Sequence, residues 1–207
     1  MAEDRSVRGR RERAKRDKQA RIMAAARDLF SERGVTAVTT QEIADRADVA
    51  IGTLYLYAAT KAELLIMVQN QKFADAIADG IAAAATRSGT GVVDGVMALV
   101  HPVVTCVRDR VENGRTYLRE LVFGDPAEPY RRAGLALSAQ LEDAIAEVVR
   151  READPVQETA ATLARVVTAI IHIATTATVY LERTDTEVLD DISTQVTAVL
   201  IGPTQNT

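Results

Sequence analysis

Apolar residues recur along most of the chain at the spacing of an α-helix. Before Gly34, four of them share one helical face, namely Ile22, Ala26, Leu29 and Phe30. Gly34 suits the left-handed residue just past a helix end, so we predict a first helix from about Arg16 to Arg33. No convincing run of alternating apolar and polar residues, the pattern of a strand, is present.

Capping signals and breaks at glycine or proline divide the chain into about nine predicted helices. Thr39-Thr40-Gln41-Glu42 and Thr60-Lys61-Ala62-Glu63 both fit a capping box. The expected helices span residues 16–33, 40–47, 51–57, 61–86, 92–110, 115–123, 127–151, 155–182 and 186–201. The fold class is therefore all-α. Pro102 falls inside the fifth helix, where we expect a kink or break because proline removes a backbone hydrogen bond.

Composition argues against several classes of function. Of the 207 residues 47% are hydrophobic and 26% charged, the balance of a globular protein. One cysteine, Cys106, and two histidines exclude an internal disulfide and a multi-Cys or His-rich metal site. We find no glycine-rich phosphate loop, nucleophile elbow or His-Glu metal motif, so we expect no enzyme, no metal and no cofactor. Pairing of Cys106 with His101 or His172 in catalysis would require the fold to bring them together.

The basic start of the chain is not followed by an apolar stretch of the secretory type. The most apolar window, Val166 to Leu181, is too short to span a bilayer and contains a histidine and four threonines. We interpret it as a buried helix and expect a soluble, cytoplasmic protein with no membrane partner.

The net charge of −4 is the sum of two unlike segments. Residues 1–61 carry 13 Lys and Arg against 9 Asp and Glu, a balance of +4, and residues 62–207 carry −8. The first 21 residues alone hold nine basic and four acidic side chains. This asymmetry predicts a flexible basic arm over residues 1–15 beside an acidic body, although a solvated disordered tail has the same composition.

Two short helices joined by a turn and preceded by a basic helix are the parts of a DNA-binding helix-turn-helix. Ala44 is small where the two short helices approach, and Val49 plugs the turn between them. Gly52 lets the second helix come close to a phosphate or to a neighbouring element. The amino ends of both helices offer free amide groups to phosphates.

Four motifs occur in order and with consistent spacing over about a fifth of the chain. They are Ala-x-x-Leu-Phe-x-x-x-Gly at 26–34, Thr-Thr-x-x-Ile-Ala at 39–44, Ala-x-Val-Ala-x-Gly-Thr-Leu-Tyr-x-Tyr at 47–57 and Thr-Lys-x-Glu-Leu at 60–64. With them, residues 22–65 resemble the N-terminal domain of the TetR (tetracycline repressor) family. The chain departs from the family pattern at Ala58, where phenylalanine is usual, so we expect looser packing there.

The resemblance implies a helix-turn-helix domain over residues 16–60, with residues 51–57 as the recognition helix in the major groove. The expected DNA contacts are Arg16, Arg21, Thr39, Thr40, Gln41, Ala50, Ile51, Gly52, Thr53, Leu54, Tyr55, Tyr57 and Lys61. Hydroxyl groups can bond base edges or phosphates, and apolar groups can touch thymine methyls. A core position for Tyr55 is an equal alternative. Few of these residues can bind guanine as arginine does, which favours recognition of DNA shape.

The rest of the chain, residues 61–202, is expected to bind a small molecule and to dimerise. Apolar residues recur on more than one side of the last two helices, so these helices form either an intrachain core or, as the resemblance implies, a four-helix bundle between two copies. The expected interface residues are Leu163, Val167, Ile170, Ala174, Leu181, Ile192 and Val196.

The resemblance also implies a small-molecule pocket between the helices of this body. Candidate lining residues are His101, Cys106, Tyr117, Phe123, Tyr130, His172 and Thr175, each of which alone is more often a core residue. Their apolar surroundings favour an apolar or amphipathic effector, and the separation of His101 from Cys106 on different helical faces argues against a metal. We expect a dimeric repressor that the effector releases from a palindromic operator. Activation, or a ligand-blind dimeric DNA-binding protein, are the alternatives.

Overall fold

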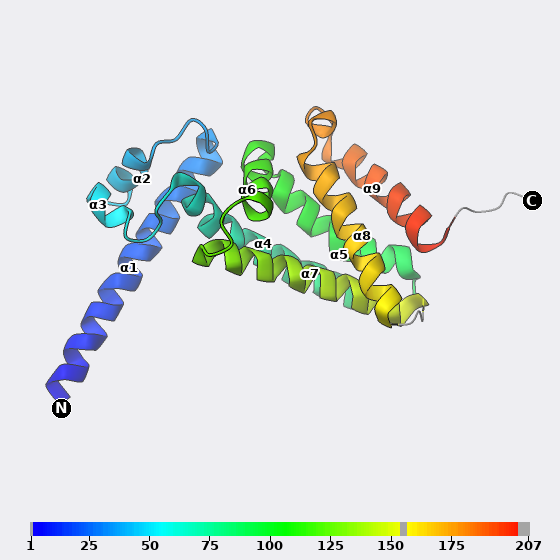
Figure 1. Cartoon of the computed structure of the whole chain (residues 1–207), viewed down its shortest axis with the longest axis horizontal. Coiled ribbons are helices and arrows are strands. Elements are labelled where there is room, and N and C mark those ends of the chain that lie inside the picture. Colours follow the sequence, from blue (N-terminus) through cyan, green and yellow to red (C-terminus); the bar gives the residue numbers. More distant parts are fainter. Residues whose placement is uncertain (1, 154–156, 203–207) are drawn as a thin grey trace, which may run out of the picture. The chain divides into compact units, whose positions relative to one another are not determined.

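The computed structural model describes residues 2–153 and 157–202. Over these residues the chain consists of nine α-helices and one short 3-10 helix, with no strand, which confirms the predicted all-α class (Figure 1). The elements are α1 (Ala2–Arg33), α2 (Thr40–Arg46), α3 (Ile51–Leu54), α4 (Lys61–Thr86), α5 (Val92–Arg108), α6 (Val111–Phe123), α7 (Pro129–Ala153), α8 (Gln157–Thr176), η1 (Thr178–Tyr180) and α9 (Asp185–Leu200).

Contacts divide the chain into two compact units, an N-terminal unit up to Val68 and a C-terminal unit from Gln69 onward. The dividing point lies inside α4, and the functional boundary that we expect at residue 60 stays a prediction. In the N-terminal unit α1 packs on α2 and α2 on α3. Its core contains the predicted apolar face of α1, together with Ile43, Leu54 and Leu64, all fully buried.

The first helix is longer than its apolar pattern predicts, because α1 already begins at Ala2. Residues 2–15, which we expected to form a flexible arm, are helical. Arginine, lysine, glutamate and alanine, which make up most of this stretch, are good helix formers, and Gly9 is its weakest residue. Residues 10–18 are all exposed, so this part of α1 is a solvated basic helix.

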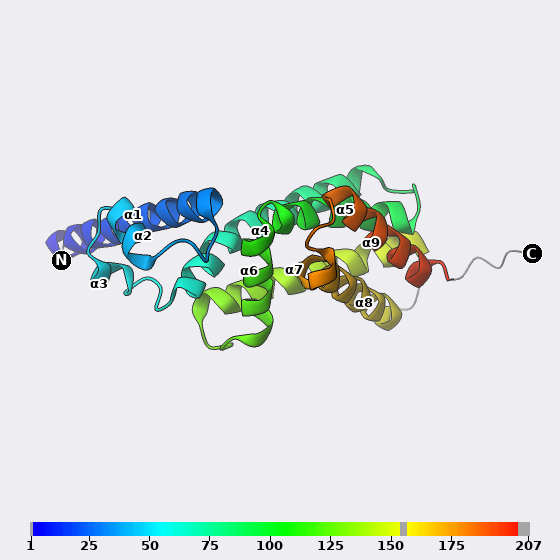
Figure 2. The same cartoon turned by 90° about the horizontal axis from the view of Figure 1, so that it is seen from above.

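The C-terminal unit is built around α5, which packs against α6, α7, α8 and α9. Helix α8 packs in turn on α6, α7 and α9, and both views show α8 and α9 running side by side (Figures 1 and 2). Fully buried side chains of this core include Leu99, Ile145, Val167 and Ile192. Buried aliphatic groups from four helices therefore hold the unit together.

We predicted a kink or a break at Pro102; the break is wrong, since α5 is continuous from Val92 to Arg108, and the kink stays a prediction. Proline costs the helix one hydrogen bond, but buried valines hold the helix on both sides of it: Val100, Val103 and Val104 are at most 1% exposed. Tertiary packing of an apolar face contributes more to helix stability than local propensity does. The packing therefore outweighs the local effect of the proline.

Besides the start of α1, three helix ends differ from the predicted ones by three residues or more. Helix α3 ends at Leu54 rather than Tyr57, because the amides of Leu56 and Tyr57 bond three residues back in a tighter turn. Helix α8 ends at Thr176 rather than 182, where the Thr176 hydroxyl bonds the carbonyl of His172 and Ala177 is extended. Helix α6 begins earlier than predicted, at Val111. The expected start of α8 at Pro155 and Val156 lies outside the described residues.

Candidate DNA interface and effector cavity

The predicted capping box of α2 is present. The Thr39 hydroxyl accepts a bond from the Glu42 amide at 3.2 Å, and the Glu42 carboxylate accepts bonds from the Thr39 amide and hydroxyl at 2.8 Å each. Arg33 Nη1 lies 2.8 Å from the same carboxylate. The hydrogen bond from Arg33, followed by those from Thr39, lowers the pKa of Glu42 from 4.5 to about 2. The amino end of α2 is therefore fixed, and Thr39, Thr40 and Gln41 occupy it.

The turn between α2 and α3 has the predicted geometry. Ala44 is buried, Val49 is half-buried, and the Val49 amide donates to the Ala44 carbonyl at 3.0 Å. Asp48 has a φ of 52°, the left-handed conformation that aspartate adopts more readily than most residues. Arg21 Nη1 of α1 lies 3.3 Å from both the carbonyl and a carboxylate oxygen of Asp48. Arg21 thus ties α1 to the turn, and its phosphate contact stays a prediction.

Helix α3 presents some of the expected DNA-contacting residues and buries another. Gly52 is exposed, while Ile51 and Thr53 are half-buried. Leu54 is fully buried in the N-terminal core, so its predicted place on the DNA side is wrong: it faces inward with the rest of the apolar pattern. A β-carbon added at Gly52 would meet no atom within 4 Å, so no neighbouring element requires this glycine.

The residues just after α3 extend the exposed surface. Tyr55 is 47% exposed and its hydroxyl lies 3.1 Å from that of Thr40, which excludes the alternative of a core aromatic. Leu56 is 84% exposed, although it is not among the expected DNA contacts. The predicted helix continued to Tyr57, whereas α3 ends at Leu54, so no signal in the sequence marked this residue. Ala58 is buried, although we expected looser packing there.

Tyr57 and Lys61 make bonds within the N-terminal unit. The Tyr57 hydroxyl donates to the Lys15 carbonyl of α1 at 3.1 Å, and Lys61 Nζ donates to the Val38 carbonyl at 2.9 Å. These bonds hold the segment after α3 in place. Exposed or half-buried residues around α2 and α3 form what we call the DNA face: Thr39, Thr40, Gln41, Ala50, Ile51, Gly52, Thr53, Tyr55 and Leu56.

The C-terminal unit contains an apolar cavity of about 510 Å3, which we call the chamber. Its walls come from α4 to α8 and include Phe73, Val107 and Leu141. Two of the predicted ligand residues, Phe123 and His172, line it. The volume falls within the range of about 300–1,000 Å3 in which proteins bind small molecules.

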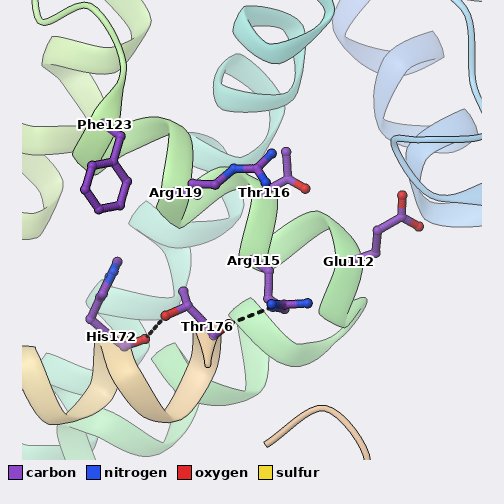
Figure 3. Close-up of a pocket in the computed structure, with 7 residues that line it drawn as sticks. All are labelled: Glu112, Arg115, Thr116, Arg119, Phe123, His172 and Thr176. Atoms are coloured by element: carbon purple, nitrogen blue, oxygen red, sulfur yellow. Dashed lines mark hydrogen bonds between the residues drawn. The ribbon is translucent and has the colours of Figure 1, made fainter. Parts of the chain in front are cut away.

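A second cavity of about 310 Å3, the vestibule, shares Phe123 and His172 with the chamber (Figure 3). Its other lining residues are polar: Glu112, Arg115, Thr116, Arg119 and Thr176. Arg115 Nε donates to the Thr176 carbonyl at 2.7 Å. Burial lowers the pKa of His172, so its imidazole is neutral at pH 7.

Three other predicted ligand residues line neither cavity because bonds within the unit hold them elsewhere. Tyr117 is buried, its hydroxyl donates to Asn70 Oδ1 at 2.9 Å, and its ring packs edge-on against Phe73. The Thr175 hydroxyl bonds the carbonyl of Ile171 in its own helix at 2.7 Å. The Tyr130 carbonyl accepts a bond from Asn70 Nδ2 at 2.8 Å. All three are structural in this arrangement.

His101 and Cys106 line a different, open groove between α4 and α5, contrary to our expectation that they lie on different faces. Lys72, Asp75 and Asp109 also line this groove. Burial raises the pKa of the Cys106 thiol to about 11, which disfavours the reactive thiolate. His172 lies instead in the chamber wall. Over the described part of the chain, no three His, Cys, Asp or Glu side chains are arranged to hold a metal ion.

Four of the seven expected dimer residues are buried within a single chain. Val167, Ala174, Ile192 and Val196 are at most 1% exposed, so they belong to the core between α8, α9 and α5. Leu163, Ile170 and Leu181 are half-buried.

The exposed apolar side chains of α8 lie on another side of the helix, where Val166 and Ile173 are 40% and 57% exposed. The window Thr159–Thr176 is long and apolar enough to cross a membrane by length and composition alone, although we expected the apolar window to be too short. Its packing on α6, α7 and α9 identifies α8 as a body helix with one open apolar side.

A three-helix unit with this turn, joined to a helical body with a partly open apolar cavity, is the architecture of a helix-turn-helix regulator. Residues 22–68 match the family model described as bacterial regulatory proteins, tetR family. This match assigns the DNA-binding segment of the chain to the TetR family of transcriptional regulators.

Individual relatives are similar over different parts of the chain. The HTH-type transcriptional repressor KstR of Mycobacterium tuberculosis is 42% identical over 60 residues, which is 29% of this chain and only 27% of KstR. A TetR transcriptional regulator from Rhodococcus sp. RHA1 has a TM-score of 0.65 at 19% identity, covering 90% of this chain and 97% of that one. The repressor FadR of Thermus thermophilus, solved with lauroyl-CoA, has a TM-score of 0.64 at 23% identity, covering 91% and 96%. At these identities the two structures show a shared fold alone.

Proposed function

We propose that the chain is an effector-responsive transcriptional repressor that binds a palindromic operator as a dimer. The observation that carries the proposal is the exposed DNA face of α2 and α3, built on the segment that matches the family model. Arg16 on the exposed basic helix α1 adds a phosphate contact, and Arg21, Tyr57 and Lys61 position the face and can each reach a phosphate.

The DNA face offers hydroxyl and apolar groups instead of guanidinium groups. Thr40, Thr53 and Tyr55 supply hydroxyls, while Ile51 and Leu56 supply apolar surface for thymine methyls. Phosphate contacts from the α1 helix position the protein without reading sequence. Selectivity should therefore favour operators rich in A·T pairs and of suitable groove shape.

The second copy that a palindrome requires is proposed to cover the open side of α8. Val166 and Ile173 are the exposed apolar groups there, and Leu163 and Ile170 are half-buried beside them. Ile173 also lines the chamber, so the second copy would border the opening of the cavity. A dimer that holds two recognition helices about 34–36 Å apart matches successive major grooves. Sedimentation of the purified chain at micromolar concentration tests this part, and a monomer would contradict it.

The chamber supports effector control over the alternative of a ligand-blind DNA-binding protein, because a body that only dimerised would have no need of a cavity of about 510 Å3. Phe73 of α4 lines this chamber, and α4 begins at Lys61 in the N-terminal unit. If an effector binds one position of α4 more tightly than another by about 1–3 kcal/mol, it can change the free energy of operator binding by as much. KstR and FadR are both named as repressors, which favours repression over activation, and a regulator of this type acts in the cytoplasm. We propose that the effector relieves this repression.

Selection of bound DNA from a random pool with the purified chain tests the proposal. We expect a palindrome, and enrichment of no sequence would overturn the proposed function. Thr53→Ala and Leu56→Ala should weaken binding of the selected DNA by roughly 1–3 kcal/mol each. Thr36→Ala, at an exposed position outside the DNA face, is the matched control and should bind as the unmodified chain does.

A further inference from the structure

The chamber and the vestibule differ sharply in chemistry although they are neighbours. Apolar side chains of five helices form nearly the whole chamber, whereas charged and hydroxyl groups surround the vestibule. Phe123 and His172, which Figure 3 shows among the residues of the vestibule, also line the chamber. A ligand that occupied both cavities would need an apolar body and a polar end.

The vestibule has an excess of positive charge. Its lining contains two arginines, Arg115 and Arg119, and one carboxylate, Glu112, and the neutral imidazole of His172 adds no charge at pH 7. The bond from Arg115 Nε to Thr176 orients that guanidinium and does not use its two Nη groups. Arg119 is 65% exposed and its nearest carboxylate oxygen, on Glu120, lies 3.8 Å away. Arg119 can therefore turn toward a ligand at little cost, and Arg115 can offer its Nη groups without breaking its bond to Thr176.

We propose that the effector is an anionic amphiphile whose apolar chain fills the chamber and whose carboxylate or phosphate head is bound by Arg115 and Arg119. The inference rests on the proposed function, because it specifies the ligand of the same effector cavity. A guanidinium group fits both heads, since its planar N–H groups match the oxygens of carboxylate and phosphate. The oxygens of Glu112 repel an anion, so the head lies on the arginine side of the vestibule.

Calorimetry with the full chain and three probes that share one alkyl chain tests the head group. The probes are laurate, lauroyl-CoA and dodecan-1-ol, which carry a carboxylate, phosphates and no charge. We expect at least one anion to bind about tenfold or more tightly than the alcohol, as charge-assisted hydrogen bonds imply. Laurate binding shows that a carboxylate suffices, whereas tight binding of lauroyl-CoA alone shows that the phosphate-bearing coenzyme A group is needed.

Variants separate the two parts of the site. Arg119→Gln should reduce anion affinity about tenfold and leave dodecanol affinity unchanged. Arg132→Gln on α7, an exposed arginine that lines neither cavity, is the matched control and should change nothing. Ser138→Phe, which places a ring in the chamber wall, should weaken all three probes. Arg115→Gln is measured last, because its bond to Thr176 also supports the fold.

Several results would overturn the inference: equal affinity for the alcohol and both anions, unchanged anion binding by Arg119→Gln, or no binding of any probe, as when a second copy covers the chamber. Binding of the selected operator is measured in parallel with each variant. If the chain binds the operator but does not prefer the anionic probes, only the anionic effector is rejected. If the unmodified chain does not bind the operator, the proposed function itself is rejected.

Discussion

Gly52 provides a substitution that separates folding from DNA binding. It is the second residue of α3, it is exposed, and a β-carbon there would meet no atom within 4 Å. Glycine loses more backbone freedom on folding than alanine, so Gly52→Ala should stabilise the chain by up to about 1 kcal/mol. For a chain of this length, that gain corresponds to a rise in Tm of about 2–4 °C.

The same methyl group should have the opposite effect on operator binding. It would project from the DNA face beside Ile51 and Thr53, where it keeps the backbone of α3 away from the duplex. Overpacking of a close contact costs about 1–3 kcal/mol, which corresponds to roughly a 5- to 150-fold loss of affinity. Thermal unfolding followed by circular dichroism and fluorescence anisotropy with the selected operator measure the two effects.

Ala139→Gly is the matched control, because it removes a methyl group from an exposed site of α7. It should lower stability by about 1 kcal/mol and leave operator affinity unchanged. If Gly52→Ala gained stability and bound the operator as tightly as the unmodified chain, the backbone of α3 would not approach DNA at this position. The reasoning about the DNA face would then fail.

Three further substitutions test other parts of the structure. Glu42→Gln should lower the Tm at pH 7, and this effect should disappear as the pH falls. Because the pKa of Glu42 is about 2 in the folded chain against 4.5 otherwise, its carboxylate stabilises the fold above pH 4.5 and less toward pH 2. An equal Tm difference at both ends of a pH 2–7 series would contradict this. Gly114→Ala should destabilise the chain to urea by about 1–3 kcal/mol or more, because its β-carbon would overlap the carbonyl oxygen of Val107; unchanged unfolding would refute that close approach. Asp48→Asn should strengthen operator binding by about 1.5- to 5-fold, because it frees Arg21 from a surface ion pair. It should also steepen the salt dependence of binding in anisotropy titrations. Equal affinity at low salt would exclude Arg21 as a phosphate contact.

Local sequence signals are sufficient to predict the elements whose ends are set by capping residues or turns. The capping box at Thr39 and Glu42 forms as predicted, and the helix expected at residues 61–86 has those bounds in the structure. Both depend on side chains no more than four residues apart, whose bonds form with little help from the rest of the chain. The turn around Val49 is predictable for the same reason.

Contacts between residues far apart in the sequence determine the burial and orientation of side chains that local patterns do not predict. Tyr117 was a reasonable candidate for the effector cavity, but Asn70, 47 positions away, fixes its hydroxyl. Val167 and Ile173 both belong to the apolar pattern of α8, yet the first is fully buried and the second 57% exposed because the neighbouring helices cover only one side. Periodicity identifies an apolar face without identifying what covers it.

The open side of α8 connects regulation to the amount of protein in the cell. Val166 and Ile173 remain exposed in one chain, and with a second copy as their cover the chains pair only above the dissociation constant of the dimer. Because a palindrome binds a pair, operator occupancy would rise with the square of chain concentration at low abundance. A modest fall in synthesis, or faster degradation of unpaired chains, would then vacate the operator without any effector.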